Sequence, residues 1–311
     1  MYQNIADATI QELIVMYRKM KKDDFALVND MLGRINSSAK KIFNNAYENG
    51  NLISCLMHDN KNNRGVFAIV EGPDYYVLQV SFEKDITNCK VIEVIHNGLD
   101  KIIKRKGSKD IFLNINGYNP SIINYFRNYN FTQDSLGFEY FFSTSLENLD
   151  SISNFKVEEG LTFKGFEEEN AENYIELLDD AFRQLDIACN EEQDRFSKSV
   201  EKSISWLRQV DEEENFGAFW HNGDLVGVYV LQDNCIHTIA VYPEYEGKGY
   251  GSQMIKYCLN RLIFARRYKE VYLQVLFQNK RVQKFYINRG FQVRGFYSEN
   301  TYVLKKGTSV I

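Results

Sequence analysis

Three alternate glycines, Gly247, Gly249 and Gly251, come directly after an apolar stretch and directly before a helical pattern. Glycine readily adopts the backbone conformations that turn successive N–H groups toward one point. The helix that follows adds the positive end of its dipole and the unpaired amides of its first turn. These residue types at this spacing predict a turn that binds a phosphate group.

The glycine spacing excludes the two commonest phosphate-binding loops. The dinucleotide fingerprint needs G-x-G-x-x-G and the nucleoside-triphosphate loop needs G-x-x-x-x-G-K-[ST], whereas this turn reads G-x-G-x-G with Lys248 between glycines. The stretch from Ile239 to Gly251 instead resembles the central motif of the GNAT N-acetyltransferases, V-x-P-x-x-[RQ]-G-x-G-x-[GA]. In that family the motif binds the pyrophosphate and pantetheine of acetyl-CoA, so the resemblance implies acetyl-CoA as the co-substrate and no metal ion.

The match to this motif includes Val241, Pro243 and the three glycines, but Glu246 stands where the family usually has Arg or Gln. A carboxylate beside a pyrophosphate repels it unless its side chain points away. Main-chain amides supply most of the contact in such a turn, and they survive this substitution. The resemblance assigns acetyl-CoA binding to Ile239, Ala240, Val241, Glu246, Gly247, Lys248, Gly249, Tyr250, Gly251, Ser252, Asn279 and Tyr286.

A second stretch, from Asn279 to Phe291, resembles the family pattern N-x-x-A-x-x-[FL]-Y-x-x-x-G-F. Tyr286 falls where many GNAT enzymes have a tyrosine that protonates the departing CoA thiolate. Twenty tyrosines occur in the chain, so this role depends on the register of the surrounding pattern, and core packing is the alternative. Asn279 is expected either to cap the helix or to hydrogen-bond the cofactor.

The resemblance also suggests a residue that would take the proton from the amine. His237 lies on the strand that lines the amine side of the family's active site, where the arylalkylamine acetyltransferases have a histidine. A neutral imidazole accepts a proton directly or through water, and the alternative role is a half-buried strand histidine. Asp233, Tyr229 and Glu299 stay open as other bases. Cys235, on the same face by period two, is a bystander or part of the substrate wall.

Apolar spacing and turn residues predict the elements that would position these side chains. In the first half we expect helices at 8–21, 24–46, 88–104 and 120–128, and strands at 51–57, 65–71, 75–82, 111–115 and 138–143. The second half repeats this order, with helices at 170–187, 191–209, 249–266 and 280–289, and strands at 215–221, 225–232, 234–242, 270–276, 291–297 and 300–305.

The repetition extends to single residues. The stretches 119–131 and 279–291 begin with Asn, end with Phe and lie 160 positions apart. Each Asn is expected to cap a helix, and Asn130 and Gly290 are expected to end those helices in a left-handed conformation. The chain is therefore predicted to be α/β (α+β), with two tandem GNAT-like domains, each a mixed, mostly antiparallel sheet flanked by helices.

The two copies differ where chemistry would occur. The stretch 82–88, equivalent to the phosphate turn, has no glycine, and Phe126 stands at the position of Tyr286 without a hydroxyl group. We therefore expect 1–145 to be a degenerate GNAT-like domain and 157–311 to be the domain that binds acetyl-CoA. The polar stretch 145–160 would join them. Tandem GNAT proteins with one intact and one decayed half are known as a group.

Charge and composition limit the partners. The chain has a net charge of −5, yet the segment 247–290 holds ten Lys or Arg residues against the single acid Glu270, which suits a polyanion such as CoA. The acidic remainder could attract a cationic amine. No RNP, zinc-finger or helix-turn-helix signature predicts a nucleic-acid partner, and no apolar run approaches the ~20 residues of a membrane span. Five cysteines without C-x-x-C spacing suggest neither a zinc site nor a disulfide framework.

These patterns together predict a cytoplasmic N-acetyltransferase that moves an acetyl group from acetyl-CoA to a primary amine by direct attack. The acceptor is a small molecule or a peptide, and its identity stays open, as does the choice between monomer and homodimer. One alternative is a non-catalytic acyl-CoA-binding module, since Glu246 departs from the motif. Another is a longer-acyl or aminoacyl transferase on the same scaffold.

Overall fold

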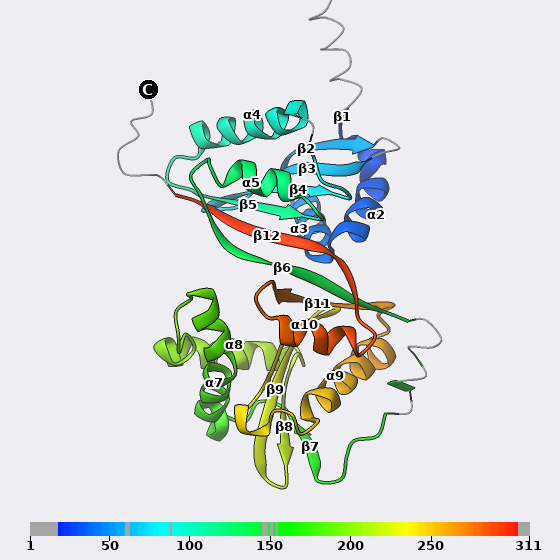
Figure 1. The fold of residues 1–311 in the computed structure, drawn as a ribbon, viewed down its shortest axis with the longest axis vertical. Coiled ribbons are helices and arrows are strands. Elements are labelled where there is room, and N and C mark those ends of the chain that lie inside the picture. Colours follow the sequence, from blue (N-terminus) through cyan, green and yellow to red (C-terminus); the bar gives the residue numbers. More distant parts are fainter. Residues whose placement is uncertain are drawn as a thin grey trace, which may run out of the picture. The chain divides into compact units, whose positions relative to one another are not determined.

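The computed structural model describes residues 18–59, 63–87, 89–144, 149, 152–153 and 155–303, apart from the side chains of residues 18, 89 and 90 (Figure 1). Its chain divides into two compact units. The first unit comprises Met1–Glu139 and Val293–Ile311, and the second unit comprises Tyr140–Gln292. The last strand of the chain thus belongs to the unit formed mainly by the first half.

The first unit contains helices on both sides of a sheet. Its helices are α2 (Phe25–Ile35), α3 (Ser37–Glu48), α4 (Cys89–Arg105) and α5 (Pro120–Phe126), after a 3₁₀ turn η1 (Lys22–Asp24). Its strands are β1 (Arg18–Lys19), β2 (Leu52–Asp59), β3 (Arg64–Glu71), β4 (Tyr75–Phe82), β5 (Asp110–Asn116), most of β6 (Phe131–Ser143) and nearly all of β12 (Gln292–Tyr302).

The strands of the first unit are ordered β1-β2-β3-β4-β5-β12-β6. Figure 1 shows red β12 beside green β5. Only β4 and β5 run parallel among the pairs with a described register, and they stay paired from Tyr75 opposite Asp110 to Ser81 opposite Asn116. Strand β12 pairs antiparallel with β5 along Tyr297–Thr301. The prediction of two strands at 291–297 and 300–305 is wrong, because β12 is continuous.

Side chains alternate between the two faces of this sheet. Leu78 and Val80 of β4 belong to the core that includes residues of α4 and α5. Val66 and Ala68 of β3 lie in a second core with residues of α2 and α3. The predicted helix at 24–46 is interrupted at Asn36, which has an extended backbone (φ −164°) and caps α3 by accepting from Ala39 N at 2.7 Å.

Two other sequence predictions differ from the first unit. The helix expected at 8–21 falls outside the described residues as far as residue 17, and at 18–19 the chain is β1, paired with β2. The strand expected at 138–143 begins earlier, at Phe131. Asn130 is left-handed, with φ 57°, as predicted.

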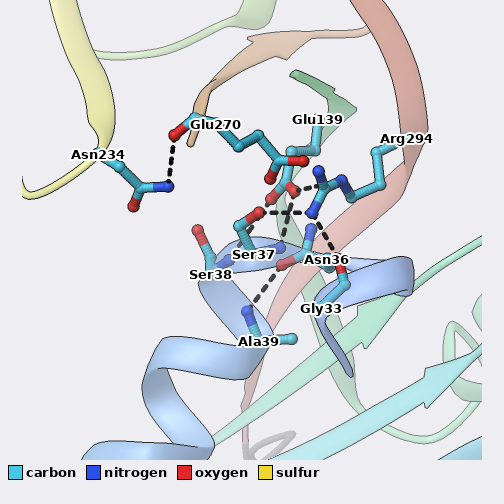
Figure 2. Close-up of polar contacts among 9 residues, drawn as sticks. All are labelled: Gly33, Asn36, Ser37, Ser38, Ala39, Glu139, Asn234, Glu270 and Arg294. Atoms are coloured by element: carbon cyan, nitrogen blue, oxygen red, sulfur yellow. Dashed lines mark hydrogen bonds and ion pairs between the residues drawn. The ribbon is translucent and has the colours of Figure 1, made fainter. Parts of the chain in front are cut away.

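A buried ion pair holds β12 to the helical corner of the first unit (Figure 2). Glu139 of β6 is fully buried and accepts a 2.7 Å hydrogen bond from Ser37 N in the first turn of α3. Arg294 Nε lies 3.6 Å from Glu139 Oε1, and Arg294 Nη1 donates to Ser37 Oγ at 2.9 Å. Burial raises the pKa of Glu139, and its contacts with Ser37 and Arg294 oppose that shift.

The second unit has the same order of elements. Its strands are β7 (Leu161–Lys164), β8 (Phe216–His221), β9 (Asp224–Gln232), β10 (Cys235–Val241) and β11 (Glu270–Leu276). Its helices are α7 (Ala171–Cys189), α8 (Val200–Glu212), α9 (Tyr250–Asn260) and α10 (Lys280–Ile287). Its shorter turns are η2 (Glu168–Asn170), η3 (Ser197–Ser199), η4 (Pro243–Tyr245) and the π-helical η5 (Arg261–Ala265).

The sheet of the second unit runs β7-β8-β9-β10-β11, with β10 and β11 parallel and the other pairs antiparallel. Tyr174 and Leu178 of α7 pack on one face with Val228 and Ala240. Tyr257 of α9 stacks on Phe163 of β7 on the other face. The predicted fold class is confirmed: the strands of each unit are mixed, mostly antiparallel and flanked by helices.

Part of one predicted helix in the second unit is wrong. The helix expected at 191–209 begins only at Val200. Asp194 has a left-handed backbone (φ 52°), and the buried carboxylate of Asp179 accepts from Phe196 N at 3.0 Å and Ser197 N at 2.9 Å. These contacts hold the segment as a loop because its amides are bonded to α7 instead of to a helix of their own.

Candidate functional site

The glycine turn between β10 and α9 has the predicted conformation. Gly247 and Gly249 have φ values of 75° and 97°, in the left-handed region that favours glycine. A Cβ atom added at either position would meet nothing within 4 Å, so the backbone there borders open space. Gly249 is the N-cap of α9, and Gly251 lies in its first turn. The turn can therefore present main-chain amides to an anion at a helix N-terminus.

Strand β10 separates from its parallel neighbour just before this turn. Among the described residues, Cys235 opposite Tyr272 is the only register pair between β10 and β11. Asn234 adds two hydrogen bonds at that point, accepting from Tyr272 N and donating to Glu270 O, both at 3.0 Å; Figure 2 shows the second. Beyond Cys235, the described residues of β10 have register pairs with β9 but not with β11, so β10 and β11 diverge. We call this divergence of the two strands the wedge.

Hydrogen-bond alternation decides which amides of β10 face the wedge. Tyr242 N donates to Val226 O of the β9 side at 3.0 Å. Alternation then directs the N–H of Ala240 to β9 and the N–H groups of Ile239 and Val241 away from it. Two of the three predicted main-chain donors thus face the opening.

Glu246, the departure from the motif, is neutralised by a residue from another element. Its carboxylate forms a bidentate ion pair with Arg281 of α10, with Nη2 2.7 Å from Oε1 and Nη1 2.5 Å from Oε2. The hydrogen bond from Arg281 lowers the pKa of Glu246, and Glu246 raises the pKa of Arg281. Arg281 was not predicted to be a site residue. The one feature of the sequence that could have indicated it is its place in the basic segment 247–290.

Other side chains near the turn are already engaged. Arg289 donates to Ser252 Oγ and, at 2.8 Å, to Phe285 O. Lys248 Nζ lies 5.0 Å from the ring centroid of Tyr245. The Tyr250 hydroxyl is 3.1 Å from His221 Nδ1. Two of the predicted binding side chains, Tyr250 and Ser252, therefore serve contacts within the protein.

Tyr286 is a buried phenol on α10, 8% exposed. Burial, and then the thiol groups of Cys258 and Cys235, raise the pKa of the phenol above its ordinary value of 10. The hydroxyl group therefore stays protonated at neutral pH, as a proton donor must. The centroid of its ring lies 5.4 Å from that of Phe291, so these two residues of the family pattern also pack against each other.

The two asparagines that begin the repeated helices behave differently. Asn279 Oδ1 accepts from Val282 N at 3.2 Å, so its predicted capping role is confirmed. Asn119 has no capping hydrogen bond from its side chain; its Nδ2 instead donates to Asn116 O at 2.7 Å and Phe82 O at 3.1 Å. The prediction that Asn119 caps its helix is therefore wrong at the level of the side chain. Gly290 is left-handed as expected, with φ 84°.

His237 is exposed on β10, with Nδ1 2.9 Å from Thr238 Oγ1. The β9–β10 register shifts between Ile236 and Thr238, so His237 occupies a β-bulge. Cys235, by contrast, is only 8% exposed. The extra residue interrupts the strict alternation on which the prediction that Cys235 and His237 share a face depends.

The alternative bases belong to different elements. Asp233 is a left-handed turn residue with φ 52°. Tyr229 is buried on the α9 side, where burial raises the pKa of its phenol and its ring contacts Tyr257. Glu299 belongs to the first unit, where it accepts from Ser135 Oγ at 2.7 Å.

Two acidic hollows on α7 were not predicted. Both are lined by Glu176 and Asp180, which lie one helical turn apart. The larger, of about 570 Å³, also has the rings of Trp220 and Tyr242 in its lining. In the smaller, of about 440 Å³, Arg183 pairs with Asp180. In the turn between β8 and β9, Asn222 and Gly223 have positive φ.

The described residues contain no cluster of three or more His, Cys, Asp or Glu side chains arranged to hold a metal ion. Within the same part of the chain, none of the helices is long and apolar enough to cross a membrane.

Residues 174–291 match the model of the Acetyltransferase (GNAT) family. A GCN5-related N-acetyltransferase from Sphaerobacter thermophilus is similar in structure, with a TM-score of 0.54 and 10% identity over 94% of this chain and 97% of that chain. A Drosophila protein is similar with a TM-score of 0.56 and 12% identity over 93% and 98%. A tandem GNAT protein from the clavulanic acid biosynthesis pathway has a TM-score of 0.49 and 12% identity over 82% and 83%. No curated protein matches the chain in sequence. The first two likenesses extend over nearly the whole chain and show its fold.

Proposed function

We propose that this protein transfers an acetyl group from acetyl-CoA to a primary amine, since residues 174–291 match the model of the GNAT acetyltransferase family, whose members use acyl-CoA. The acceptor in this proposal is a small molecule or a peptide. The single observation that carries it is the open glycine turn at the end of β10, directly after the wedge between β10 and β11.

The turn and the strand supply complementary contacts for the coenzyme. The amides of Gly247, Gly249 and the first turn of α9 would bind the diphosphate. The N–H groups of Ile239 and Val241 would bind the pantetheine arm as an added strand is bound. Ala240 contributes its small buried side chain to the core instead.

The proposed chemistry uses His237 of β10 and Tyr286 of α10. The thioester supplies an acyl group whose C–S bond breaks as a C–N bond forms with the amine. His237 would accept the proton that the ammonium loses, directly or through water. Tyr286, kept protonated by burial, would donate a proton to the departing sulfur. No covalent enzyme intermediate is needed.

We also propose that this activity belongs to the 157–311 half and that the 1–145 half is a degenerate copy. In the first unit β4 and β5 stay paired to Ser81 opposite Asn116, so no wedge opens between them. A Cβ atom on Gly117 would lie 2.0 Å from Phe82 O, which shows how closely the chain covers the end of β4. Phe126, 1% exposed, replaces the acid with a packed ring.

The test uses the full chain. Binding of CoA is measured by calorimetry, and release of free thiol from acetyl-CoA is measured over a panel of amines, amino sugars, polyamines and peptides. Saturable binding with turnover on at least one amine supports the proposal. Binding without turnover on any acceptor supports the non-catalytic acyl-CoA-binding module, and turnover only with longer acyl-CoA donors or aminoacyl donors supports the other transferase. Failure to bind CoA contradicts the proposal, the binding module and a transferase that uses longer acyl-CoA donors, and leaves only a transferase that uses aminoacyl donors.

A further inference from the structure

The ion pair between Glu246 and Arg281 lies at the turn where the coenzyme is proposed to bind. Glu246 immediately precedes Gly247, the first of the two left-handed glycines that border open space. Arg281 reaches it from the first turn of α10, across 35 positions of sequence. The pair therefore joins the phosphate turn to the helix that carries Tyr286.

Arg281 keeps binding capacity while it is paired. A guanidinium group has five N–H donors, and the two hydrogen bonds to Glu246 come one from each terminal nitrogen. The Arg281 side chain is 73% exposed, against 36% for Glu246. Three donors and most of the side chain thus stay accessible at the edge of the turn.

The charge arrangement also favours an anion at this place. Glu246 alone would repel a diphosphate, whereas the paired carboxylate is neutralised and holds the guanidinium in one orientation. A guanidinium group matches the geometry of phosphate oxygens and binds them through parallel hydrogen bonds. An arginine already oriented by a carboxylate loses less conformational freedom on binding.

We propose that Arg281, held in place by Glu246, binds the diphosphate of the coenzyme and supplies the positive charge that the family motif usually has at position 246. This inference rests on the proposed function. It makes Arg281 a cofactor-binding residue and Glu246 a positioning residue that does not itself touch the phosphates.

The test compares the affinities of full-length variants for CoA by calorimetry. Arg281→Ala removes the guanidinium group and leaves the carboxylate facing the phosphates, so we expect the Kd to rise roughly tenfold or more. Glu246→Gln keeps an oxygen that accepts from Arg281 and removes the negative charge, so we expect binding at least as tight as wild type. Adding Glu246→Gln to Arg281→Ala should recover part of the loss.

The chain offers a matched control. Arg208 of α8 forms another exposed ion pair, in which its Nη2 donates to both carboxylate oxygens of Glu168, at 2.8 and 2.9 Å. Arg208→Ala should leave the Kd for CoA unchanged. The same measurements are made with 3′-dephospho-CoA, which still contains the diphosphate. The ratio of the Kd of Arg281→Ala to the Kd of wild type should be the same as with CoA.

Three results would overturn the inference. An unchanged Kd in Arg281→Ala would remove the arginine from the binding site. Equal losses in Arg281→Ala and Glu246→Gln would make the pair a structural latch of the turn. Loss of the effect with 3′-dephospho-CoA would place the contact at the 3′-phosphate. Wild-type protein that does not bind CoA at all would instead refute the proposed function, which separates the two failures.

Discussion

At the scale of single residues, burial and pairing give the ionisable groups of the second unit their properties. Tyr286 is 8% exposed, and burial is the largest cause of its raised pKa. Glu246 is more accessible, and the hydrogen bond from Arg281 is the largest cause of its lowered pKa. The phenol is thus kept neutral and the carboxylate is kept charged, each in the state that its proposed role requires.

The variant Tyr286→Phe tests whether Tyr286 is the general acid that protonates the departing sulfur. General acid catalysis contributes about a hundredfold or more to rate, so we expect kcat to fall by that order while the Kd for CoA is unchanged. Burial raises the pKa, so the phenol of the wild type stays protonated as pH rises through 10, the ordinary value, and kcat should show no loss there from this group. Thiol release measured between pH 7 and 10.5 checks both statements.

A second tyrosine provides the control for this variant. Tyr257→Phe removes the phenolic hydroxyl of a residue that stacks on Phe163 at 4.0 Å between ring centroids, on the α9 face. It should leave kcat within a factor of two of wild type. A Tyr286→Phe variant as active as this control would exclude the acid role.

At the scale of elements, both repeated units use a parallel strand pair, but only one pair opens. In the second unit β10 and β11 share one register pair, while β4 and β5 of the first unit share seven, from Tyr75 to Ser81. The bulge at His237 accompanies the opening, because an extra residue bends its strand and increases the local twist. The wedge and the glycine turn therefore follow each other along a single strand.

Gly249→Ala tests the turn. A side chain at φ 97° is strained, with a cost of about 1–2 kcal/mol, so the Tm should fall by several degrees. The strained turn should also bind CoA more weakly, because its amides no longer converge. Gly223→Ala is the matched variant, since Gly223 has φ 95° and equally open surroundings in the β8–β9 turn. It should lower the Tm to a similar extent and leave the Kd for CoA unchanged; equal Kd values in the two variants would contradict the role of Gly249.

The buried pair Glu139–Arg294 tests how β12 is held in the first unit. Removing one partner of a buried ion pair costs about 3–5 kcal/mol because the other charge is left unpaired. Arg294→Met and Glu139→Gln should each lower the free energy of unfolding, Arg294→Met by the larger amount, since Gln still accepts from Ser37 N. The double variant should lose clearly less than the sum, as urea denaturation would show; additive losses would mean that the two side chains are not coupled.

At the scale of the whole molecule, the compact units do not coincide with two consecutive halves of sequence. Val293–Ile311 groups with Met1–Glu139, and β12 pairs with β5 along Tyr297–Thr301. Of the seven strands described for the first unit, β12 comes from the end of the chain. Without β12, strand β5 would present an unpaired edge.

Fragment expression tests this arrangement. A protein of residues 1–145 lacks β12, so we expect no cooperative unfolding transition by circular dichroism and a tendency to aggregate. The same fragment followed by a Gly/Ser linker and residues 292–303 should unfold cooperatively, because the linked strand can pair with β5. A linked segment with Arg294→Met serves as the weakened control. Cooperative unfolding of 1–145 alone, with the same stability as the linked fragment, would contradict the prediction.

The sequence by itself determined the features that depend on near neighbours along the chain. It predicted the boundaries of β4 and β11, the glycine turn at 247–251, the cap at Asn279 and the left-handed residues Asn130 and Gly290, since each follows from the conformational preferences of a few consecutive residues. The fold class followed from the resemblance of the motifs to a known family and from the repeat. The tertiary structure alone decided that Arg281 neutralises Glu246, that β10 leaves β11 after Cys235, and that β12 pairs with β5. These contacts join residues far apart in sequence, and no local pattern specifies which distant partner a side chain or a strand edge will meet.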